Sequence, residues 1–304
     1  MTAWKEKRLS LAKAVPAMIR LIKQAEIAGE IANVAHGYYM LGFLYVGHSK
    51  FSHALPAIQN AFKLFEQIDY KHRMVAVSIS EGEMYRFTGY LTQADACYQR
   101  AITIADEVPP EEFDSVRADT MFARGNRGHI ALANKQYEVA VTRFTQALKT
   151  LETHYKDAED WMTAYETIYC EYGSALVESL VHVDEAAAWQ QIEQVYLLAT
   201  EIDRPLEQAF AHRGIALMLD TSLTPPDVQW IHDSDYHFDR ANKYFSATNY
   251  RYETARTLEY RMEALRKTGE LDTARRLLSD VIQQYTRMGL YERVKRLNQL
   301  RQTL

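Results

Sequence analysis

The densest group of side chains that could do chemistry is the stretch His232–Asp239, which reads His-Asp-Ser-Asp-Tyr-His-Phe-Asp. Imidazoles and carboxylates are common metal ligands, so a metal site is one interpretation. The spacing matches neither a His-Glu-x-x-His motif nor a calcium loop, and no pair of cysteines accompanies it. Residues 233–235 are also suited to begin a helix, because a carboxylate accepts hydrogen bonds from free backbone N–H groups. We therefore predict a helix start here and no metal site.

Other arrangements that could support catalysis are weaker. Cys97 and Cys170 stand far apart in the sequence and fit no metal-ligand spacing. Cys97 lies between Ala94 and Tyr98 on a predicted packing face, which indicates a buried thiol and not a nucleophile. The run 125–128, Gly-Asn-Arg-Gly, falls inside a predicted helix and follows no strand, so it is no phosphate-binding loop. The sequence therefore predicts a protein that is not an enzyme and binds no cofactor.

A spacing shared by three stretches indicates how the chain folds. In each stretch an alanine lies twelve positions after a glycine, a larger side chain follows four positions later, and a second alanine three positions after that. Small residues let two helix backbones approach, and the larger side chain fills the space between them. We predict that Gly82 and Ala94 are such close contacts. The three sets are Gly42-Ala54-Ile58-Ala61, Gly82-Ala94-Tyr98-Ala101 and Gly128-Ala140-Phe144-Ala147.

This pattern resembles the tetratricopeptide repeat, a helix–turn–helix unit that carries Leu-Gly-x-x-Tyr, as at Leu41–Tyr45, and then Ala-x-x-x-Phe. The resemblance implies an all-α fold, a right-handed superhelical solenoid of about five to six helix pairs. The period is longer than the usual length of about 34 residues, since Ala101 follows Ala61 by 40 positions. In this respect the chain resembles the repeat arrays of bacterial signalling and transcription regulators.

The extra residues of each period extend the second helix of the repeat. We expect these extended helices to end at Asp69, Asn249 and Gly289, residue types that tolerate the left-handed conformation. The fourth repeat matches least well, because Glu185 occupies the expected alanine position. Its neighbours Ala186–Ala188 offer competing registers, and the sequence leaves the choice between them open.

The whole chain, residues 1–304, is predicted to form a single solenoid. One interruption is the segment Thr221–Asp233, an irregular connection because its Pro225-Pro226 pair cannot continue a helix. The predicted parts are degenerate N-terminal helices at 1–34, clear repeats at 35–74, 75–120 and 121–165, a degenerate repeat at 166–206, a repeat with an insertion at 207–254, and a last repeat with a capping helix at 255–304.

Composition bears on the location of the protein. Of 304 residues, 47% are hydrophobic, which is ample for a core, and only 12 glycines and 7 prolines interrupt the helical pattern. The stretch Met1–Leu11 lacks the apolar run of a signal peptide. No stretch approaches the roughly 20 apolar residues needed to span a bilayer. We therefore expect a cytoplasmic protein with no membrane partner.

The resemblance also implies which residues line the inner groove, because in this family the first helix of each repeat faces it. Chaperone-binding members grip a carboxylate there with Lys and Asn. Tyr39 and Phe43 hold those positions here, so that function is disfavoured. The carried-over positions are His36, Tyr39, Phe43 and Val46, then Ala76, Ile79, Glu83 and Arg86, then Phe122, Gly125, His129 and Leu132. For any one aromatic residue, packing between repeats is the alternative. The predicted partner-binding residues are Tyr39, Phe43, Glu83, Arg86, Phe87 and His129.

The net charge of −5 conceals an uneven distribution. Residues 1–50 carry seven basic and three acidic side chains, a balance of +4. Residues 51–250 carry 16 against 30, a balance of −14, and residues 251–304 carry 12 against seven, a balance of +5. The acidic middle argues against nucleic acid as the main ligand. The basic C-terminal helix is either a solvated end of the solenoid or a docking surface. A docking surface could meet an acidic partner or the acidic middle of a second copy, which would give a homo-oligomer.

These observations favour a non-catalytic protein–protein interaction module that binds a peptide or protein segment, in a bacterial regulatory or assembly complex. The alternative is a peptide-responsive sensor or a regulatory subunit of a transcription regulator or signalling enzyme. In a sensor, binding would change the pitch of the solenoid, because its curvature is a sum of small rotations between repeats. Binding at the convex face or at the basic C-terminal helix is also open.

Overall fold

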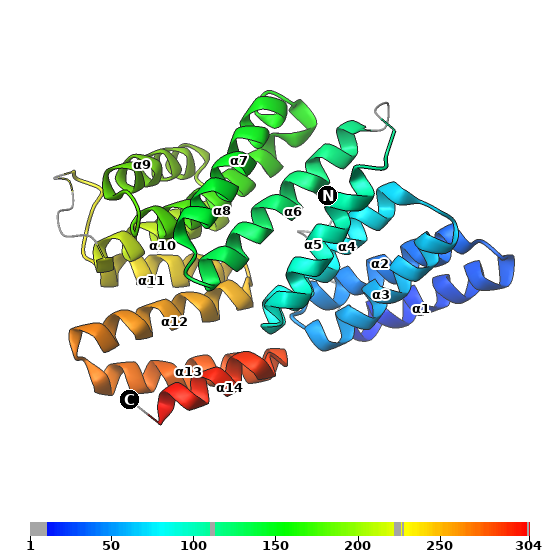
Figure 1. Ribbon diagram of the computed structural model, residues 1–304. Coiled ribbons are helices and arrows are strands. Elements are labelled where there is room, and N and C mark those ends of the chain that lie inside the picture. The colour runs from blue at the N-terminus through cyan, green and yellow to red at the C-terminus, as the bar shows by residue number, and fades with distance from the viewer. Residues whose placement is uncertain (1–10, 110–112, 222–225, 227, 303) are drawn as a thin grey trace. The chain divides into compact units, whose positions relative to one another are not determined.

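The computed structural model describes residues 11–109, 113–221, 226, 228–302 and 304. This part of the chain contains fourteen α-helices, one short 3-10 helix and no strand (Figure 1). Two predictions lie partly outside it, since residues 1–10 and Pro225 are not among the described residues. The elements are α1 (Leu11–Ala28), α2 (Ile31–Gly47), α3 (Phe51–Gln67), α4 (Lys71–Thr88), α5 (Leu91–Ala105), α6 (Phe113–Ala133), α7 (Tyr137–Tyr155), η3 (Glu159–Trp161), α8 (Met162–Leu180), α9 (Glu185–Ile202), α10 (Pro205–Thr221), α11 (Ser234–Ala247), α12 (Arg251–Thr268), α13 (Leu271–Met288) and α14 (Tyr291–Arg301).

The helices alternate between two roles. The even-numbered helices α2 to α12 are called first helices, and all of them except α12, which has Met262 at that position, carry a repeat glycine. The odd-numbered helices α3 to α13 are called second helices. A Cβ added at Gly82 of α4 would lie 2.6 Å from the ring of Tyr98 of α5, and Ala94 of α5 is fully buried. The predicted close contact is therefore confirmed. The same relation holds between Gly42 and Ile58 and between Gly128 and Phe144.

The structure settles the register of the fourth repeat, which the sequence left open. Gly173 of α8 faces the second helix α9, where an added Cβ would lie 2.6 Å from Val195. The buried face of α9 begins three residues after Glu185, and its spacing follows one side of a helix. Its fully buried residues are Ala188, Ile192, Val195 and Ala199.

Helix ends follow residue type. Asp69 and Asn249 have φ angles of 49° and 59°, and Gly289 has 75°, so all three adopt the left-handed conformation that the sequence predicts. Between α10 and α11, the described residues 226 and 228–233 form no helix. The carboxylate of Asp233 accepts a hydrogen bond from the backbone N–H of Tyr236 at 2.7 Å, which confirms the predicted helix start.

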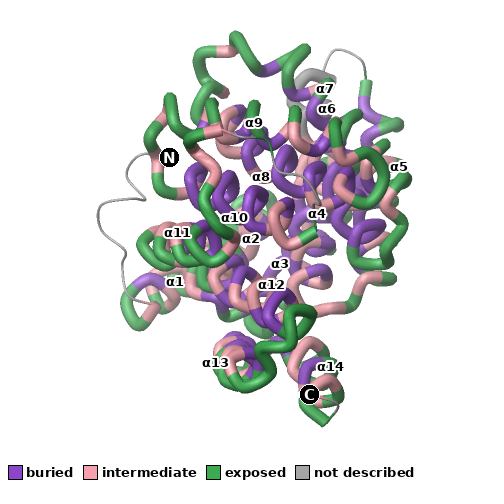
Figure 2. The backbone as a smooth tube through the Cα atoms, turned by 90° about the vertical axis from the view of Figure 1, so that its left-hand side faces the viewer, coloured by how far each residue is buried: buried purple, intermediate pink, exposed green. Residues whose placement is uncertain are grey.

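The chain divides into two compact units. The first comprises Met1–Ala123 with Met288–Leu290, and the second comprises Arg124–Arg287 with Tyr291–Leu304. In the second unit, α10 is buried without interruption from Glu207 to Ala216 (Figure 2). This run contains ionisable side chains, and buried polar groups need partners inside the protein. One hydrophobic core cluster of the first unit comprises Ile22, Val34, Leu41 and Ala57, and one of the second unit comprises Ala216, Phe238 and Ala264.

Candidate partner-binding site

Two of the predicted residues form an aromatic pair on α2. Tyr39 and Phe43 lie one helical turn apart, and their ring centroids are 4.7 Å apart in an edge-to-face arrangement. The hydroxyl of Tyr39 forms a hydrogen bond with the hydroxyl of Ser80 on α4, at 3.1 Å. Burial raises the pKa of Tyr39 to about 12, so its phenol stays neutral. Phe43 is 38% exposed, which leaves one ring of a fixed pair open to solvent.

Charged residues lie close to this pair. Asp119 of α6 and Glu83 of α4 raise the pKa of Tyr39 further, and Arg73 of α4 opposes them. Burial raises the pKa of Asp119 to about 6, and the charge of Arg73 acts in the opposite direction. Of these residues, the sequence analysis had identified only Tyr39 and Glu83. It missed Ser80, Arg73 and Asp119, since they fall outside the positions carried over from the family.

Arg86 and Phe87 pack mainly into the interior of the first unit. Arg86 is 5% exposed, and its guanidinium lies 4.6 Å from the ring centroid of Phe87. Phe87 is half-buried and lies 5.3 Å from the ring of Phe51 on α3. Burial raises the pKa of Tyr98 on α5, and the charge of Arg86 opposes this rise. The two residues therefore lie between α4 and its neighbours α3 and α5.

His129 belongs to the second unit, whereas the other five predicted residues belong to the first. It is 7% exposed, with its ring 4.9 Å from Phe144 and 5.9 Å from Tyr172. Its Nε2 atom is 3.9 Å from Oε1 of Glu171, which makes an ion pair only when the imidazole is protonated. The structure thus brings Tyr39, Phe43 and Glu83 together and encloses His129 between aromatic rings.

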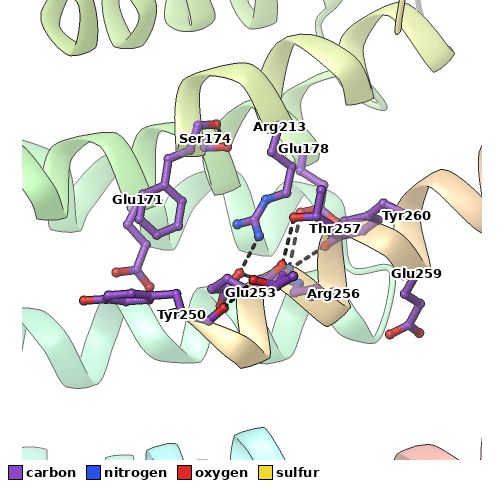
Figure 3. Close-up of polar contacts among 12 residues, drawn as sticks. Glu171, Ser174, Glu178, Arg213, Tyr250, Glu253, Arg256, Thr257, Glu259 and Tyr260 are labelled. Carbon is purple, nitrogen blue, oxygen red and sulfur yellow. Dashed lines mark hydrogen bonds and ion pairs between the residues drawn. The ribbon is translucent and has the colours of Figure 1, made fainter. Parts of the chain in front are cut away.

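A buried polar network in the second unit was not predicted at all (Figure 3). Arg213 of α10 pairs with Glu253 of α12. Arg256 of α12 lies 3.5 Å from Oε2 of Glu178 on α8, and the hydroxyl of Tyr260 donates to Oε1 of Glu178 at 2.6 Å. Removing such charges from water is unfavourable unless their partners are well placed. The network therefore fixes how the first helices α8, α10 and α12 lie against one another.

One sequence signal could have located part of this network. The position directly before the repeat glycine is charged in three repeats, and the structure buries it in two of them. Glu81 precedes Gly82 and pairs with Arg100 of α5 at 2.5 Å. Arg213 likewise precedes Gly214. A charged residue next to the closest approach of two helices is expected to be enclosed, and so to need a partner.

The two cysteines, the other reactive groups considered from the sequence, are enclosed. Cys97 and Cys170 are buried, and burial raises the pKa of each thiol to about 12, so both stay protonated. Among the described residues, no three His, Cys, Asp or Glu side chains are placed to hold a metal ion. No helix in the same part of the chain has the length and hydropathy of a membrane span.

Comparisons with known proteins bear on family and fold. Residues 79–107 match the model of the tetratricopeptide repeat family. The crystal structure of the apo form of RapI matches with a TM-score of 0.71 at 12% identity, over 94% of this chain and 96% of that chain. The TPR domain of P58(IPK) matches at 14% identity over 95% and 99% of the two chains, with a TM-score of 0.22. Curated protein sequences give no match.

The likeness of fold rests on RapI, and it confirms the all-α solenoid that the sequence predicts. The family model that matches is that of a repeat and not of an enzyme family. Stacked repeats of this type offer extended surfaces to other proteins. With a tetratricopeptide repeat matched at 79–107, and helix pairs joined through the same glycine contacts on either side of it, the chain contains a tetratricopeptide repeat within a solenoid of similar helix pairs.

Proposed function

We propose that this protein is a non-catalytic module that binds a peptide or protein segment over α2 and α4 of its first unit. The observation that carries the proposal is the Tyr39–Phe43 pair, in which one ring is anchored by Ser80 and the other is exposed. A ring that is already held in place loses little conformational entropy on binding, so its contact with a partner is favourable. Phe43 is the proposed centre of the surface.

The charges beside the pair suggest the chemistry of the partner. Asp119 keeps a raised pKa of about 6 even though the charge of Arg73 opposes the rise. A cation brought by a ligand would stabilise the ionised form of this desolvated carboxylate. Glu83 adds a second negative charge nearby. We infer that the bound segment carries a Lys or Arg beside an apolar residue. The apolar residue would cover Phe43.

The other predicted residues have supporting parts in this proposal. Arg86 and Phe87 pack between α4 and its neighbours α3 and α5, so their proposed part is to support the position of α4. His129 stays a proposed contact of the second unit, to be tested separately. Because it is enclosed by Phe144 and Tyr172, its part would be to position Glu171, which is the more exposed of the two.

The experiment is a selection of phage-displayed random peptides on the purified chain, followed by titration of synthetic copies by fluorescence anisotropy. Phe43→Ala should weaken binding by about ten- to a hundredfold, because truncation of a central aromatic contact typically removes about 1.5–3 kcal/mol. The selected peptides should be enriched in Lys or Arg, and Asp119→Asn should reduce that enrichment.

Met40→Ala is the matched control, since Met40 is also on α2 and is 38% exposed, as Phe43 is. It should leave affinity within about twofold, the scale of an ordinary rim contact. Equal binding to wild type and Phe43→Ala would contradict the proposed surface. Charge reversal at Lys295 and Arg301 would then test the basic helix α14, where Arg296 already pairs with Glu259.

A sensor within a regulatory assembly is the second candidate function. The observation that favours it is the network of Arg213, Glu253, Arg256 and Glu178, which links three successive first helices (Figure 3). Linked ion pairs have few intermediate arrangements, so a ligand that moved one helix would shift the others with it. Small-angle X-ray scattering with and without a selected peptide distinguishes the sensor from a module that only binds. A change in the radius of gyration supports the sensor, and an unchanged profile supports the plain module.

A further inference from the structure

Two buried imidazoles of the second unit hold the segment between α10 and α11. His212 of α10 and His237 of α11 face each other with their Nδ1 atoms 2.8 Å apart. Nε2 of His237 accepts a hydrogen bond from the backbone N–H of His232, at 3.1 Å. His237 is fully buried, and His212 is nearly so. One ring therefore bonds both to the facing helix and to the connecting segment, residues 228–233.

The hydrogen bonds fix where the protons lie. A backbone N–H can only donate, so Nε2 of His237 carries no proton. The neutral ring then has its proton on Nδ1 and donates it to Nδ1 of His212, whose own proton lies on Nε2. A further proton would have to enter at Nε2 of His237 or at Nδ1 of His212. Either site would then place two N–H groups face to face, so one of the two hydrogen bonds must break.

The surroundings oppose that further proton. Burial is the largest effect on both rings and lowers the pKa of His212 to about 4 and that of His237 to about 3. Arg240 and His232 lower both values further, and Asp233 alone raises that of His237. The helices α8, α9 and α12 also pack on this helix pair, and after burial the largest effect on the pKa of His237 is that of His212, which lowers it. The rings around the pair are those of Tyr196, Tyr236 and Tyr244.

The connecting segment has few other attachments. Its backbone hydrogen bonds from Val228 to Pro226 and from Ile231 to Val228 are internal to the connection, and at its end Asp233 caps α11 by accepting from Tyr236 and His237. Trp230 stacks on Tyr196 of α9, with ring centroids 4.6 Å apart, and His232 lies against Tyr236. Ahead of this cap, the bond from the backbone N–H of His232 to Nε2 of His237 is the described hydrogen bond that ties the segment to a helix.

We propose that the His212–His237 pair is a clasp that holds the connecting segment and the first turn of α11 in place when both rings are neutral and releases them on acidification. Release separates Trp230 from Tyr196 and so exposes the faces that these two rings bury against each other at neutral pH. The ion pairs of α8, α10 and α12 lie outside the clasp, so the rest of the unit stays folded. The clasp is independent of the binding surface proposed for the first unit.

The size of the effect follows from proton linkage. Once released, each imidazole titrates near 6.5, so moving from about pH 7.5 to about pH 5 favours the open form by about thirtyfold per histidine. The two rings together give about three orders of magnitude. The sign is fixed because the closed form binds fewer protons than the open form between the lowered pKa values and 6.5, so closure weakens as the pH falls through that range.

Hydrogen exchange of the full chain, read by mass spectrometry at about pH 7.5 and about pH 5 and corrected for intrinsic exchange rates, tests the proposal. Protection in peptides covering 228–237 should fall by about a hundred- to a thousandfold. Peptides of α8 should lose less than about threefold. Unchanged protection at 228–237, or an equal loss in α8, overturns the clasp.

Two variants and one spectrum complete the test. His212→Asn keeps an acceptor for His237 but cannot titrate, so the loss should shrink to about thirtyfold. His232→Asn keeps the backbone N–H and removes only an exposed imidazole, so the full loss should remain. If His212→Asn retains the full loss, the proposal is wrong. If that variant does not fold, imidazole nitrogen shifts of the wild type decide: a proton on Nε2 of His237 at neutral pH refutes the clasp, and one on Nδ1 supports it.

Discussion

Replacing Glu253 by glutamine should destabilise the second unit far more than its small change in shape suggests. Glu253 is the carboxylate that pairs with Arg213, and both side chains are buried, with exposures of 11% and 5%. The guanidinium of Arg213 otherwise faces the rings of Phe210 and Phe245, at 5.3 and 5.1 Å. Without Glu253, a buried cation loses its counter-charge.

The magnitude can be worked from these contacts. Breaking one side of a buried ion pair typically costs about 3–5 kcal/mol, because the other charge stays desolvated. The aromatic faces around Arg213 recover about 1 kcal/mol of that. Arg256 loses its second anion, 3.8 Å away, but keeps Glu178. We therefore expect Glu253→Gln to lower the free energy of unfolding by about 2–4 kcal/mol.

Urea unfolding followed by circular dichroism measures the change, and a double-mutant cycle isolates the pair. Arg213→Met added to Glu253→Gln should restore part of the loss, with a coupling energy of about 2 kcal/mol. Glu263→Gln is the control, because Glu263 pairs with Arg266 on the surface of the same helix and should cost less than about 0.5 kcal/mol. If Glu253→Gln and Glu263→Gln cost the same, the argument from burial is refuted.

Two more variants test the first unit. Gly82→Ala should cost about 1–3 kcal/mol, because its Cβ would lie 2.6 Å from the ring of Tyr98, and adding Tyr98→Leu should relieve most of it; a Gly82→Ala protein with an unchanged thermal midpoint would exclude the close contact. Asp119→Asn should stabilise the protein by about 1–2 kcal/mol at pH 7, measured by urea unfolding, because burial has raised the pKa of Asp119 to about 6. The folded state then binds more protons than the unfolded state between the ordinary pKa and 6, so wild-type stability falls as the pH rises through that window. A variant with the same pH slope there as the wild type would contradict this.

The helix pairing could be predicted from sequence because it depends on local spacing. The distance from Gly82 to Ala94 is set by one turn between two helices, and Tyr98 follows on the same face, so the contact is encoded within seventeen residues. The left-handed ends at Asp69 and Asn249 are equally local. The register of the fourth repeat could not be predicted, because three consecutive alanines fit the pattern equally well. Only the burial of Ile192, Val195 and Ala199 on the same face selects Ala188.

The site was predicted only in part, for a physical reason. The pairing of Tyr39 with Phe43 follows from their places one turn apart on a single helix. The burial of Arg86 depends on α3 and α5, and that of His129 depends on Tyr172, which is 43 residues further along the chain. A pattern within one helix does not specify which neighbours close over it. The partners of Arg213 could not be predicted for the same reason.

The bond between Glu178 and Tyr260 also bears on how the chain acquires its structure. The two residues are 82 positions apart, and they join α8 to α12 past the whole intervening repeat. A solenoid held only by adjacent repeats can add them one after another as the ribosome delivers them. Here the carboxylate of Glu178 stays hydrated until α12 has been synthesised, and closing so long a loop slows the step that buries it. The docking of α12 is therefore a late and concerted event, in which the polar side chains of α8, α10 and α12 are desolvated in one step.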